Sequence, residues 1–382
     1  MEGGGLGVIA NGLVLTEGKT IRYVGPMKPI PVGYRVIDAR GKIVMPGLVD
    51  SLTHVGLVEI VASPETNDGE PRRAIFPQVR VIDAFNLSSR ALKKTRIAGI
   101  TTILSAPNGR NPISGRSLLV KTTGEANIDK IVVKRIVALH LNLGDPPKTL
   151  QRRSDPKTAK TRMGVVAMLR EVFVRAQAYR RLAALAKSGP RRHQFKRNLA
   201  LEVLARVLER KLPVIIRAHR ADDILTARRL AKEFGFRWIL RGAAEAYKVA
   251  KFLKVDHVPV LLGPIRLRLA DLETRRARLD NAAILYKAGV RLAIASSEIY
   301  NARNLPYEAA FAVAWGLPRV VALRALTIEP ARIFGVENRI GSLKRGKDAD
   351  IVVFSGDPLV LLSRVEYVIV NGRLTDSHPQ PE

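Results

Sequence analysis

Hydrophobic and polar positions follow two different patterns along the chain. Near both ends, short apolar runs are separated by turn residues, at positions 7–9, 12–15, 20–25, 34–38, 350–354 and 367–372. Such runs are typical of short β-strands. Between them, apolar runs at 100–104, 131–141, 212–216, 237–240, 258–262 and 290–295 alternate with helical periodicity at 163–185, 199–210, 222–234, 243–252 and 307–316. The alternation predicts a parallel sheet covered by helices, and the number of units suits a barrel.

Composition narrows the class of protein. The chain has 382 residues, of which 47% are hydrophobic, so it can bury a sizeable core. It has no apolar run of the ~18 residues that cross a bilayer, and we expect no signal peptide at Met1–Gly5. Because it has no cysteine, it can form neither a disulfide nor a thiolate metal site. We therefore predict a cytoplasmic protein that does not bind membranes.

Charge is the most unusual feature of the composition. The chain has 64 Lys and Arg against 34 Asp and Glu, a net charge of +30, and +27 of this falls on residues 46–337. Proteins from hot environments also have many charged residues, but mostly as balanced ion pairs. An excess of this size predicts a polyanionic partner, with nucleic acid as the first choice.

Seven motifs follow one another along almost the whole chain. They are residues 44–56, with a proline-glycine turn before His54, and residues 99–102, 160–164, 219–224, 245–250, 327–331 and 341–351. Together they resemble the metal-dependent amidohydrolase superfamily, in particular its imidazolonepropionase-like and prolidase-like members. The resemblance implies an α/β fold: a (β/α)8 TIM-type barrel over residues 46–337, and a small β-sandwich built from residues 1–45 and 338–382.

The same resemblance implies a metal centre at the barrel mouth, where a bound water becomes hydroxide and an aspartate carries the proton. Most positions of that ligand set are substituted here, by Leu52, Arg217, Gly242 and Ser297, and the bridging lysine position falls on His140. Leucine has no lone pair, and arginine keeps its proton. We therefore expect no catalytic residues and no cofactor, and hence a catalytically inactive enzyme fold.

Three histidines at the ends of expected strands support an alternative. His54, His140 and His219 could form a reduced zinc site, since three ligands and a water are a workable catalytic set. The chain would then be a metal-dependent hydrolase of cyclic amide or other non-peptide or dipeptide C–N bonds. Otherwise the three imidazoles bond to one another or to the backbone. Asp222 and Asp223 fit a helix start better than a catalytic pair.

Clusters of basic residues are the main support for the hypothesis of a nucleic-acid partner. Residues 147–162 and 187–197 are rich in Lys and Arg, and further Arg residues follow position 265. Only 5% of residues are aromatic, which favours phosphate contacts on structured RNA over base stacking. The predicted nucleic-acid-binding residues are Arg152, Arg153, Lys157, Lys160, Arg191, Arg192, Lys196, Arg197, Arg275 and Arg276. The leading hypothesis is therefore an inactive amidohydrolase fold that binds structured RNA, with the ribosome as its most economical source. A regulatory partner of an active paralogue is a further alternative.

Overall fold

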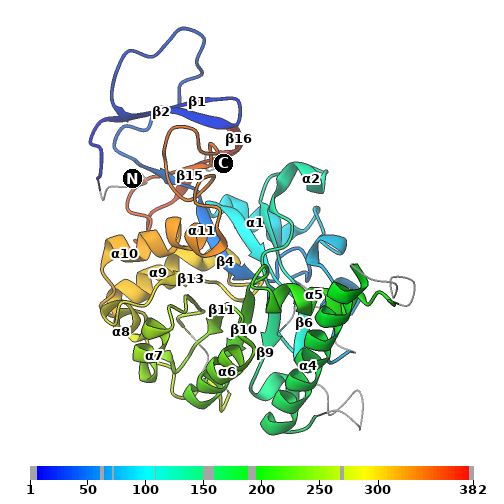
Figure 1. The fold of residues 1–382 in the computed structure, drawn as a ribbon. Helices are drawn as coiled ribbons and strands as arrows, with labels where there is room; N and C mark the ends of the chain where they lie inside the picture. The colour runs from blue at the N-terminus through cyan, green and yellow to red at the C-terminus, as the bar shows by residue number, and fades with distance from the viewer. Residues whose placement is uncertain are drawn as a thin grey trace.

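The computed structural model describes residues 7–60, 64–70, 73–107, 109–148, 159–187, 195–266 and 271–377. Figure 1 shows strands and surrounding helices in the lower part of the molecule, with strands from both ends of the chain gathered above them. No helix within the described ranges is long and apolar enough to cross a membrane.

Parallel strands form the centre of the lower part. Strand β4 (Leu48–Thr53) pairs with β5 (Ile100–Ser105), and five further strands pair with their neighbours in chain order. These five are β9 (Leu139–Asn142), β10 (Val214–Ala218), β11 (Trp238–Gly242), β12 (Val260–Leu262) and β13 (Leu292–Ile294). The α/β class expected from the alternating pattern is confirmed, with strands and helices arranged as in a TIM-type barrel.

The helices lie outside these strands. They are α1 (Arg90–Ile97), α2 (Ile128–Ile131), α4 (Arg162–Lys187), α5 (Leu199–Leu208), α6 (Ala221–Phe234), α7 (Ala250–Val255), α8 (Asn281–Lys287), α9 (Leu305–Ala314), α10 (Arg319–Ala325) and α11 (Ile328–Phe334), with 3-10 turns η1 (Pro64–Thr66), η2 (Val81–Asp83), η4 (Ala246–Lys248) and η5 (Ala302–Asn304). Helix α4 is fixed to α6 because the buried ring of Phe173 stacks on Phe234 and Phe236, with ring centroids 5.0 and 5.3 Å away. This packing sets the position of Arg162 at the start of α4.

Backbone pairing divides the ring of strands into two sheets. Strand β7 (Leu118–Lys121) pairs antiparallel with β5 and with β8 (Val132–Lys134), and β6 (Ile113–Arg116) pairs antiparallel with β9. The run at 131–141, expected as one strand, is therefore split into β8 and β9. It breaks where the charged ends of Lys134 and Arg135 bond to the carbonyl of Phe334 and to Asp129. On the other side, the Ser297 N–H donates to the Leu52 carbonyl at 2.9 Å and so links β4 to the end of β13.

Alternation along the strands separates two hydrophobic layers. Ile216 and Leu240 belong to the large cluster that packs against the helices, whereas Ile215 and Ile239 belong to a second cluster with Leu52, Leu104, Leu261 and Ala293. Side chains two residues apart on a strand share a face. Arg217 and Arg241 therefore lie on the same inner face as Ile215 and Ile239, nearer the carboxyl ends of their strands.

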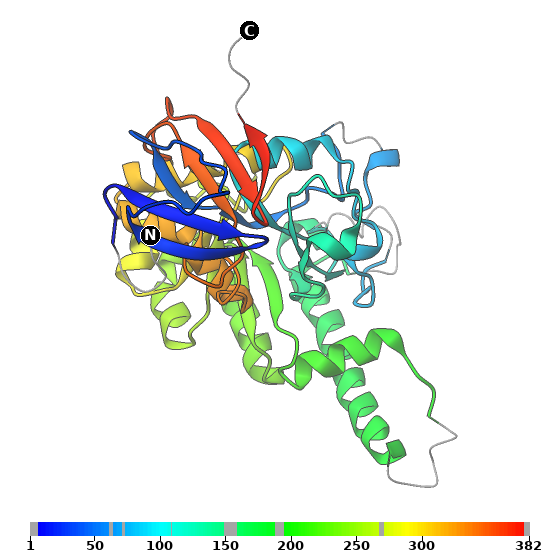
Figure 2. The same ribbon diagram turned by 90° about the horizontal axis from the view of Figure 1, so that it is seen from above.

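Strands from both ends of the chain form the upper part. Strands β3 (Ile43–Pro46), β14 (Ile351–Phe354), β15 (Val365–Val370) and β16 (Arg373–Ser377) make one antiparallel sheet, and β1 (Gly12–Glu17) pairs with β2 (Thr20–Pro26). Figure 2 shows the two groups of strands lying near each other. Residues 34–38, expected as a strand, have no regular structure. The domain boundaries at residues 45 and 338 stay a prediction.

One buried lysine joins the two parts. Lys121, at the end of β7, is 1% exposed, and its Nζ lies 2.7 Å from Asp348 Oδ2 and 3.0 Å from Asp350 Oδ2. Asn371 Oδ1 accepts a further hydrogen bond from the same ammonium. Because all three partners follow or precede strands of the upper sheet, the motif at 341–351 ties that sheet to the inner strands.

Candidate active site

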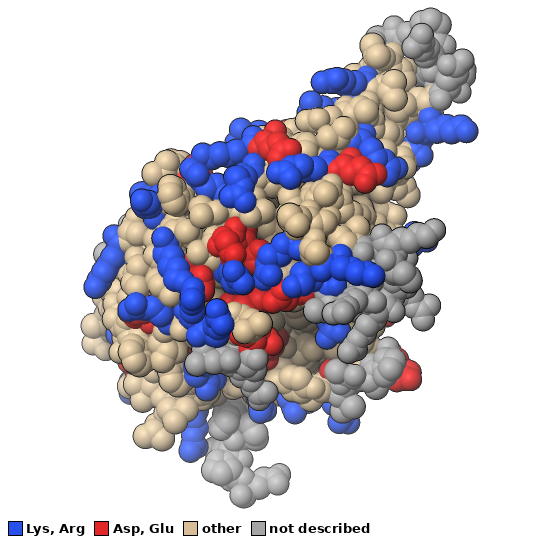
Figure 3. Space-filling view, turned by 90° about the horizontal axis from the view of Figure 1, so that it is seen from below, with Lys and Arg blue, Asp and Glu red and all other residues tan. Residues whose placement is uncertain are grey.

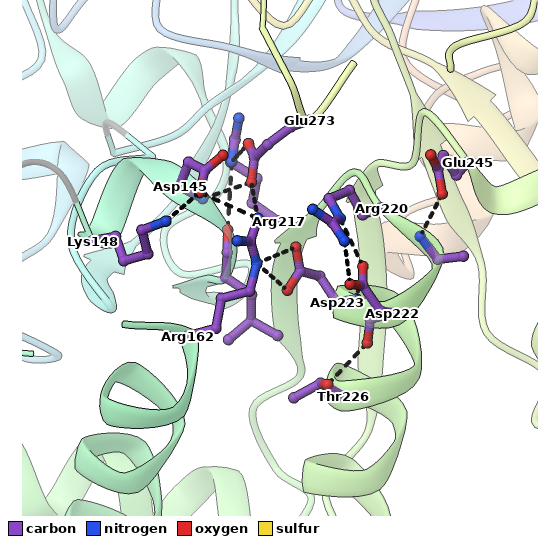
Figure 4. Close-up of polar contacts among 12 residues, drawn as sticks. Asp145, Lys148, Arg162, Arg217, Arg220, Asp222, Asp223, Thr226, Glu245 and Glu273 are labelled. Atoms are coloured by element: carbon purple, nitrogen blue, oxygen red, sulfur yellow. Dashed lines mark hydrogen bonds and ion pairs between the residues drawn. The ribbon is translucent and has the colours of Figure 1, made fainter. Parts of the chain in front are cut away.

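Polar side chains gather where four parallel strands end. The chain segments that follow β9, β10, β11 and β12 carry Asp145, Asp223, Glu245 and Glu273. Arg217 is the last residue but one of β10 (Figure 4). The carboxyl ends of barrel strands form the face on which TIM-barrel enzymes place their active sites. We therefore take this mouth as the candidate active site.

Arg162 and Glu273 are the centre of an ion network at this mouth. The Arg162 guanidinium lies 3.1 Å from Asp223 Oδ1, 3.2 Å from Asp145 Oδ1 and 3.7 Å from Glu273 Oε1. Glu273, 3% exposed, also binds Arg217 Nη1 at 3.2 Å and accepts the Asp145 N–H at 2.6 Å. Figure 4 shows these side chains turned toward one another from separate segments. The network fixes the segment after β9 against the segment after β12.

A glycine makes this close approach possible. A Cβ on Gly144 would lie 1.8 Å from Glu273 Oε1, and the residue has φ +90°, a conformation that side chains disfavour. Any larger residue at this position would push the carboxylate away from Arg217. Gly144 is therefore part of the support for the mouth.

Arg241 is the most deeply buried cation of the site. It is 6% exposed, it is next to Arg217 in the β10–β11 register, and its Nη1 has no hydrogen-bond partner. Burial, and secondarily the charge of Arg217, lower the pKa of the guanidinium to about 9, so it remains charged at neutral pH. Its Nη2 packs against Gly109, where a Cβ would lie only 2.2 Å away.

Two imidazoles lie beside Arg241. His140, 1% exposed, has no partner for either ring nitrogen, and its electrostatic neighbours are Arg241 and His54. His54 donates its Nδ1–H to the Ala106 carbonyl at 2.8 Å, which leaves the Nε2 lone pair available. Burial lowers the pKa of His54 to about 4 and holds that of His140 well below its usual value. Both rings are therefore neutral at pH 7.

His219 does not join this pair. Its ring lies over Gly242, where a Cβ would be 2.8 Å from Cε1 and Nε2, and its electrostatic neighbours are Arg217 and Arg241. Burial again lowers its pKa well below the usual value, and Nδ1 has no partner. The three histidines of the alternative zinc site thus consist of a pair and a separate third ring.

A buried carboxylic acid and two serines lie deeper in the same layer. Asp50 is fully buried and accepts hydrogen bonds from the backbone N–H groups of Ser296 and Leu52, at 3.0 and 3.2 Å, and from the Ser296 hydroxyl. Burial raises its pKa to about 7. Ser297, at the family's aspartate position, has φ +58° and donates its hydroxyl to the Gly263 carbonyl at 2.9 Å.

The described residues do not fit a full zinc ligand set. Within the described ranges, no group of three or more His, Asp or Glu side chains is placed to hold a metal ion. His54 and His140 supply two imidazole nitrogens, but the Arg241 cation lies next to both. His219 packs over Gly242, and its electrostatic neighbours are Arg217 and Arg241 rather than the other two histidines.

Comparison with known proteins decides the family. The sequence model of the amidohydrolase family matches residues 43–375. An amidohydrolase from Thermotoga maritima has the same fold with a TM-score of 0.89, is 32% identical, and is matched over 96% of this chain and 95% of its own. The chain belongs to the amidohydrolase family.

Curated members of this family are more distant. The imidazolonepropionase of Bdellovibrio bacteriovorus is 25% identical over 92% of this chain and 84% of its own length. The amidohydrolase tasK of Hapsidospora irregularis is also 25% identical, over 87% of this chain, and the chain spans only 36% of that protein. A 5-methylthioadenosine/S-adenosylhomocysteine deaminase from Symbiobacterium thermophilum is 25% identical over 92% of this chain and 82% of its own length.

Two expectations from the sequence are wrong in view of these relatives. The expectation of a catalytically inactive fold is contradicted because the relatives carry the names of active hydrolases and deaminases. The expectation of no cofactor is contradicted by fold neighbours that hold zinc, such as an adenosine deaminase from Xanthomonas campestris with bound Zn, TM-score 0.53 and 16% identity. Substituted ligand positions alone were not sufficient grounds for either expectation.

The predicted nucleic-acid-binding residues are only partly described. Arg152, Arg153, Lys157, Arg191 and Arg192 lie outside the described residues, whereas Lys160, Lys196, Arg197, Arg275 and Arg276 are exposed. Arg197 pairs with Glu202 at 2.6 Å. Figure 3 shows a face on which Lys and Arg surround a central group of acidic side chains. RNA binding by these residues stays a prediction.

Sequence reasoning missed the carboxylates of the site. It interpreted residues 147–162 as a basic loop at the barrel mouth and named no acidic partner for it, yet Lys148 and Arg162 bind Asp145, and Arg162 also binds Asp223. Asp223 was expected at a helix start, where it does lie, but its side chain is turned to Arg162. Glu273 had no motif around it. The one available signal was its place after an apolar strand, where barrel-mouth residues occur.

Proposed function

We propose that this chain is a hydrolase of C–N bonds in small amides, such as cyclic amides or other non-peptide or dipeptide substrates. The observation that carries the proposal is His140, a neutral imidazole on β9 beside Arg241, with both ring nitrogens buried and without a partner. Membership of the amidohydrolase family supports the reaction class. The site, rather than the fold, has to carry this assignment, since one fold serves many reactions.

The residues present can move the proton that hydrolysis requires. His140 has one ring nitrogen with a lone pair, and a neutral imidazole accepts a proton from water as the water oxygen attacks the amide carbon. His54 is held in a fixed tautomer by the Ala106 carbonyl, so its Nε2 can accept but not donate. The proton taken from water then goes to the leaving nitrogen, so that an acid and an amine result.

The charges of the mouth favour the same reaction. A tetrahedral intermediate places a negative charge on the former carbonyl oxygen, and a preorganised cation at that point lowers the barrier. Arg241 supplies a charge that lies beside His140 and has no carboxylate bonded to it among the described residues. In fold neighbours that hold zinc, the ion would activate water. Because the described residues do not fit a full ligand set, we derive no step from it.

A hydrolysis assay with a matched pair of histidine variants tests the proposal. The purified protein, as isolated and after zinc supplementation, is offered a panel of lactams, cyclic imides, N-acyl amino acids and dipeptides, and amine release is measured. We expect His140→Gln to lower kcat/KM by roughly 10²–10⁴. His257→Gln, at an exposed position away from the mouth, serves as the control. No turnover on any substrate, or equal turnover by the two variants, would contradict the proposal.

A further inference from the structure

A buried cation for which the described residues supply no counter-charge lies at the barrel mouth. Arg241 is 6% exposed, and no hydrogen bond or ion pair joins it to another residue in the described part of the chain. Removing one ion from water costs several kcal/mol when nothing compensates its charge. Natural proteins pair such charges or coordinate them to a ligand. The packing of the fold alone therefore does not explain why a charged guanidinium is buried at the position of Arg241.

The neighbours of Arg241 do not supply the missing negative charge. Arg217 is a second cation, and Glu273, the carboxylate that pairs with it among the described residues, is shared with Arg162 and with the Asp145 N–H. His54, His140 and His219 are neutral. Within the described part of the chain, the inner end of the mouth thus has two guanidinium charges against one shared carboxylate.

Several buried polar atoms near Arg241 have no hydrogen-bond partner. Nη1 of Arg241, both ring nitrogens of His140 and Nδ1 of His219 are buried and lack partners. Each neutral imidazole carries one N–H, so these groups together provide a guanidinium and up to two ring donors. Gly109 packs against Arg241 Nη2, and Asn142 Oδ1, an acceptor without a partner, lies near the same glycine, whereas Nη1 is the guanidinium nitrogen that has no partner.

We propose that Arg241, with Arg217 behind it, binds an oxyanion, and that this oxyanion is a carboxylate of the substrate. A guanidinium matches a planar carboxylate through two parallel N–H···O bonds. The part of the proposal that assigns the carboxylate to a substrate rests on the proposed hydrolase function. The part that assigns an anion site to Arg241 does not, since anion binding is measured without turnover. In this assignment the anchored carboxylate holds the substrate while His140 faces the C–N bond.

The test compares an anion with its neutral isostere. Thermal unfolding of the full chain is followed in a low-chloride buffer with added acetate, acetamide or inorganic phosphate. We expect acetate at about a hundred times its Kd to raise the Tm by about 3 °C, and acetamide to leave it unchanged. Phosphate tests the other source of an oxyanion, and a response to phosphate but not to acetate would overturn the carboxylate assignment.

Three arginine variants test whether the acetate-induced rise in Tm comes from binding at Arg241. Arg241→Met should abolish the acetate shift and unfold at or above the wild-type Tm without anion, because it removes an uncompensated buried charge. Arg175→Met, at an exposed position on α4, should keep the shift and reports any general effect of salt. If Arg241→Met does not fold, Arg241→Lys is titrated by calorimetry, and we expect at least tenfold weaker acetate binding. An acetate shift equal in Arg241→Met, or equal affinity in Arg241→Lys, would overturn the proposal.

The two proposals fail in different ways. Absence of turnover with an intact acetate response would refute the hydrolase and leave the anion site standing. Turnover of neutral and anionic amides with equal kcat/KM, together with no acetate response, would refute the anion site and leave the hydrolase standing.

Discussion

Replacing Asp50 by Asn should change how the stability of this amidohydrolase depends on pH. The carboxyl is fully buried, and burial raises its pKa from 3.8 to about 7. Between these values the folded state binds a proton that the unfolded state has lost, so stability falls as pH rises through this window. A displacement of about three pKa units corresponds to about 4 kcal/mol, present below pH 4 and absent above pH 7.

The Asn variant keeps the shape of the protonated acid. Its carbonyl can accept the N–H groups of Ser296 and Leu52, and its amide can donate to the Ser296 hydroxyl. Asp50→Asn should therefore be similar to the wild type near pH 4 and more stable than it at pH 8, by up to about 4 kcal/mol.

Denaturant unfolding at pH 4, 5, 6, 7 and 8 measures this difference. Asp271→Asn, at an exposed position, is the control and should give a curve parallel to the wild type. Because other buried acids titrate in both proteins, the difference between wild type and Asp50→Asn is the quantity to plot. A difference that stays constant with pH would refute the reasoning, and so would one that grows toward low pH.

Three further predictions concern other residues. Lys121→Met should lower the free energy of unfolding by roughly 3–5 kcal/mol in a urea titration, since it leaves the buried Asp350 carboxylate without its cation, whereas Asp348 keeps its ion pair with Arg339; a loss under 1 kcal/mol would contradict this. Gly242→Ala should cost more than about 1 kcal/mol and more than Gly235→Ala, because both have positive φ but only the first would press a Cβ on His219. The chain should bind duplex RNA more weakly as salt rises, and Lys196→Glu should make the log–log slope shallower by roughly 1 in a filter-binding assay. An unchanged slope would remove that residue from the predicted RNA surface.

The order of elements could be read from the sequence because it depends on local patterns. The apolar runs at 212–216 and 237–240 became β10 and β11 within two residues, and the helical periodicity at 222–234 became α6. Gly235, at φ +72°, ends that helix as a glycine after a helical run usually does. The antiparallel insertions β6 and β7 were not predicted, because short strands between turns do not specify their partners.

The site was less predictable because its contacts join distant segments. Arg162 and Glu273 are separated by more than a hundred positions, and nothing in the spacing of charges shows that they meet. The sequence placed His54, His140 and His219 at strand ends, which the structure confirms for His54 and His219 but not for His140, the second residue of β9, and it could not show that Arg241 is an electrostatic neighbour of all three. Position on a strand predicts the face of a side chain, whereas the neighbours on that face depend on the register of the whole sheet.

The pairing of β3 with β14 has a consequence for how the chain folds during synthesis. Among the residues that the structure describes, strand β3 pairs with β14 alone, and the two are separated by roughly 300 residues. At a ribosomal rate of about 5–20 residues per second, β3 waits about 15–60 s for its partner. During that time its hydrogen-bonding edge is open to other chains. The inner strands and their helices must therefore become compact before the two ends of the chain can be joined.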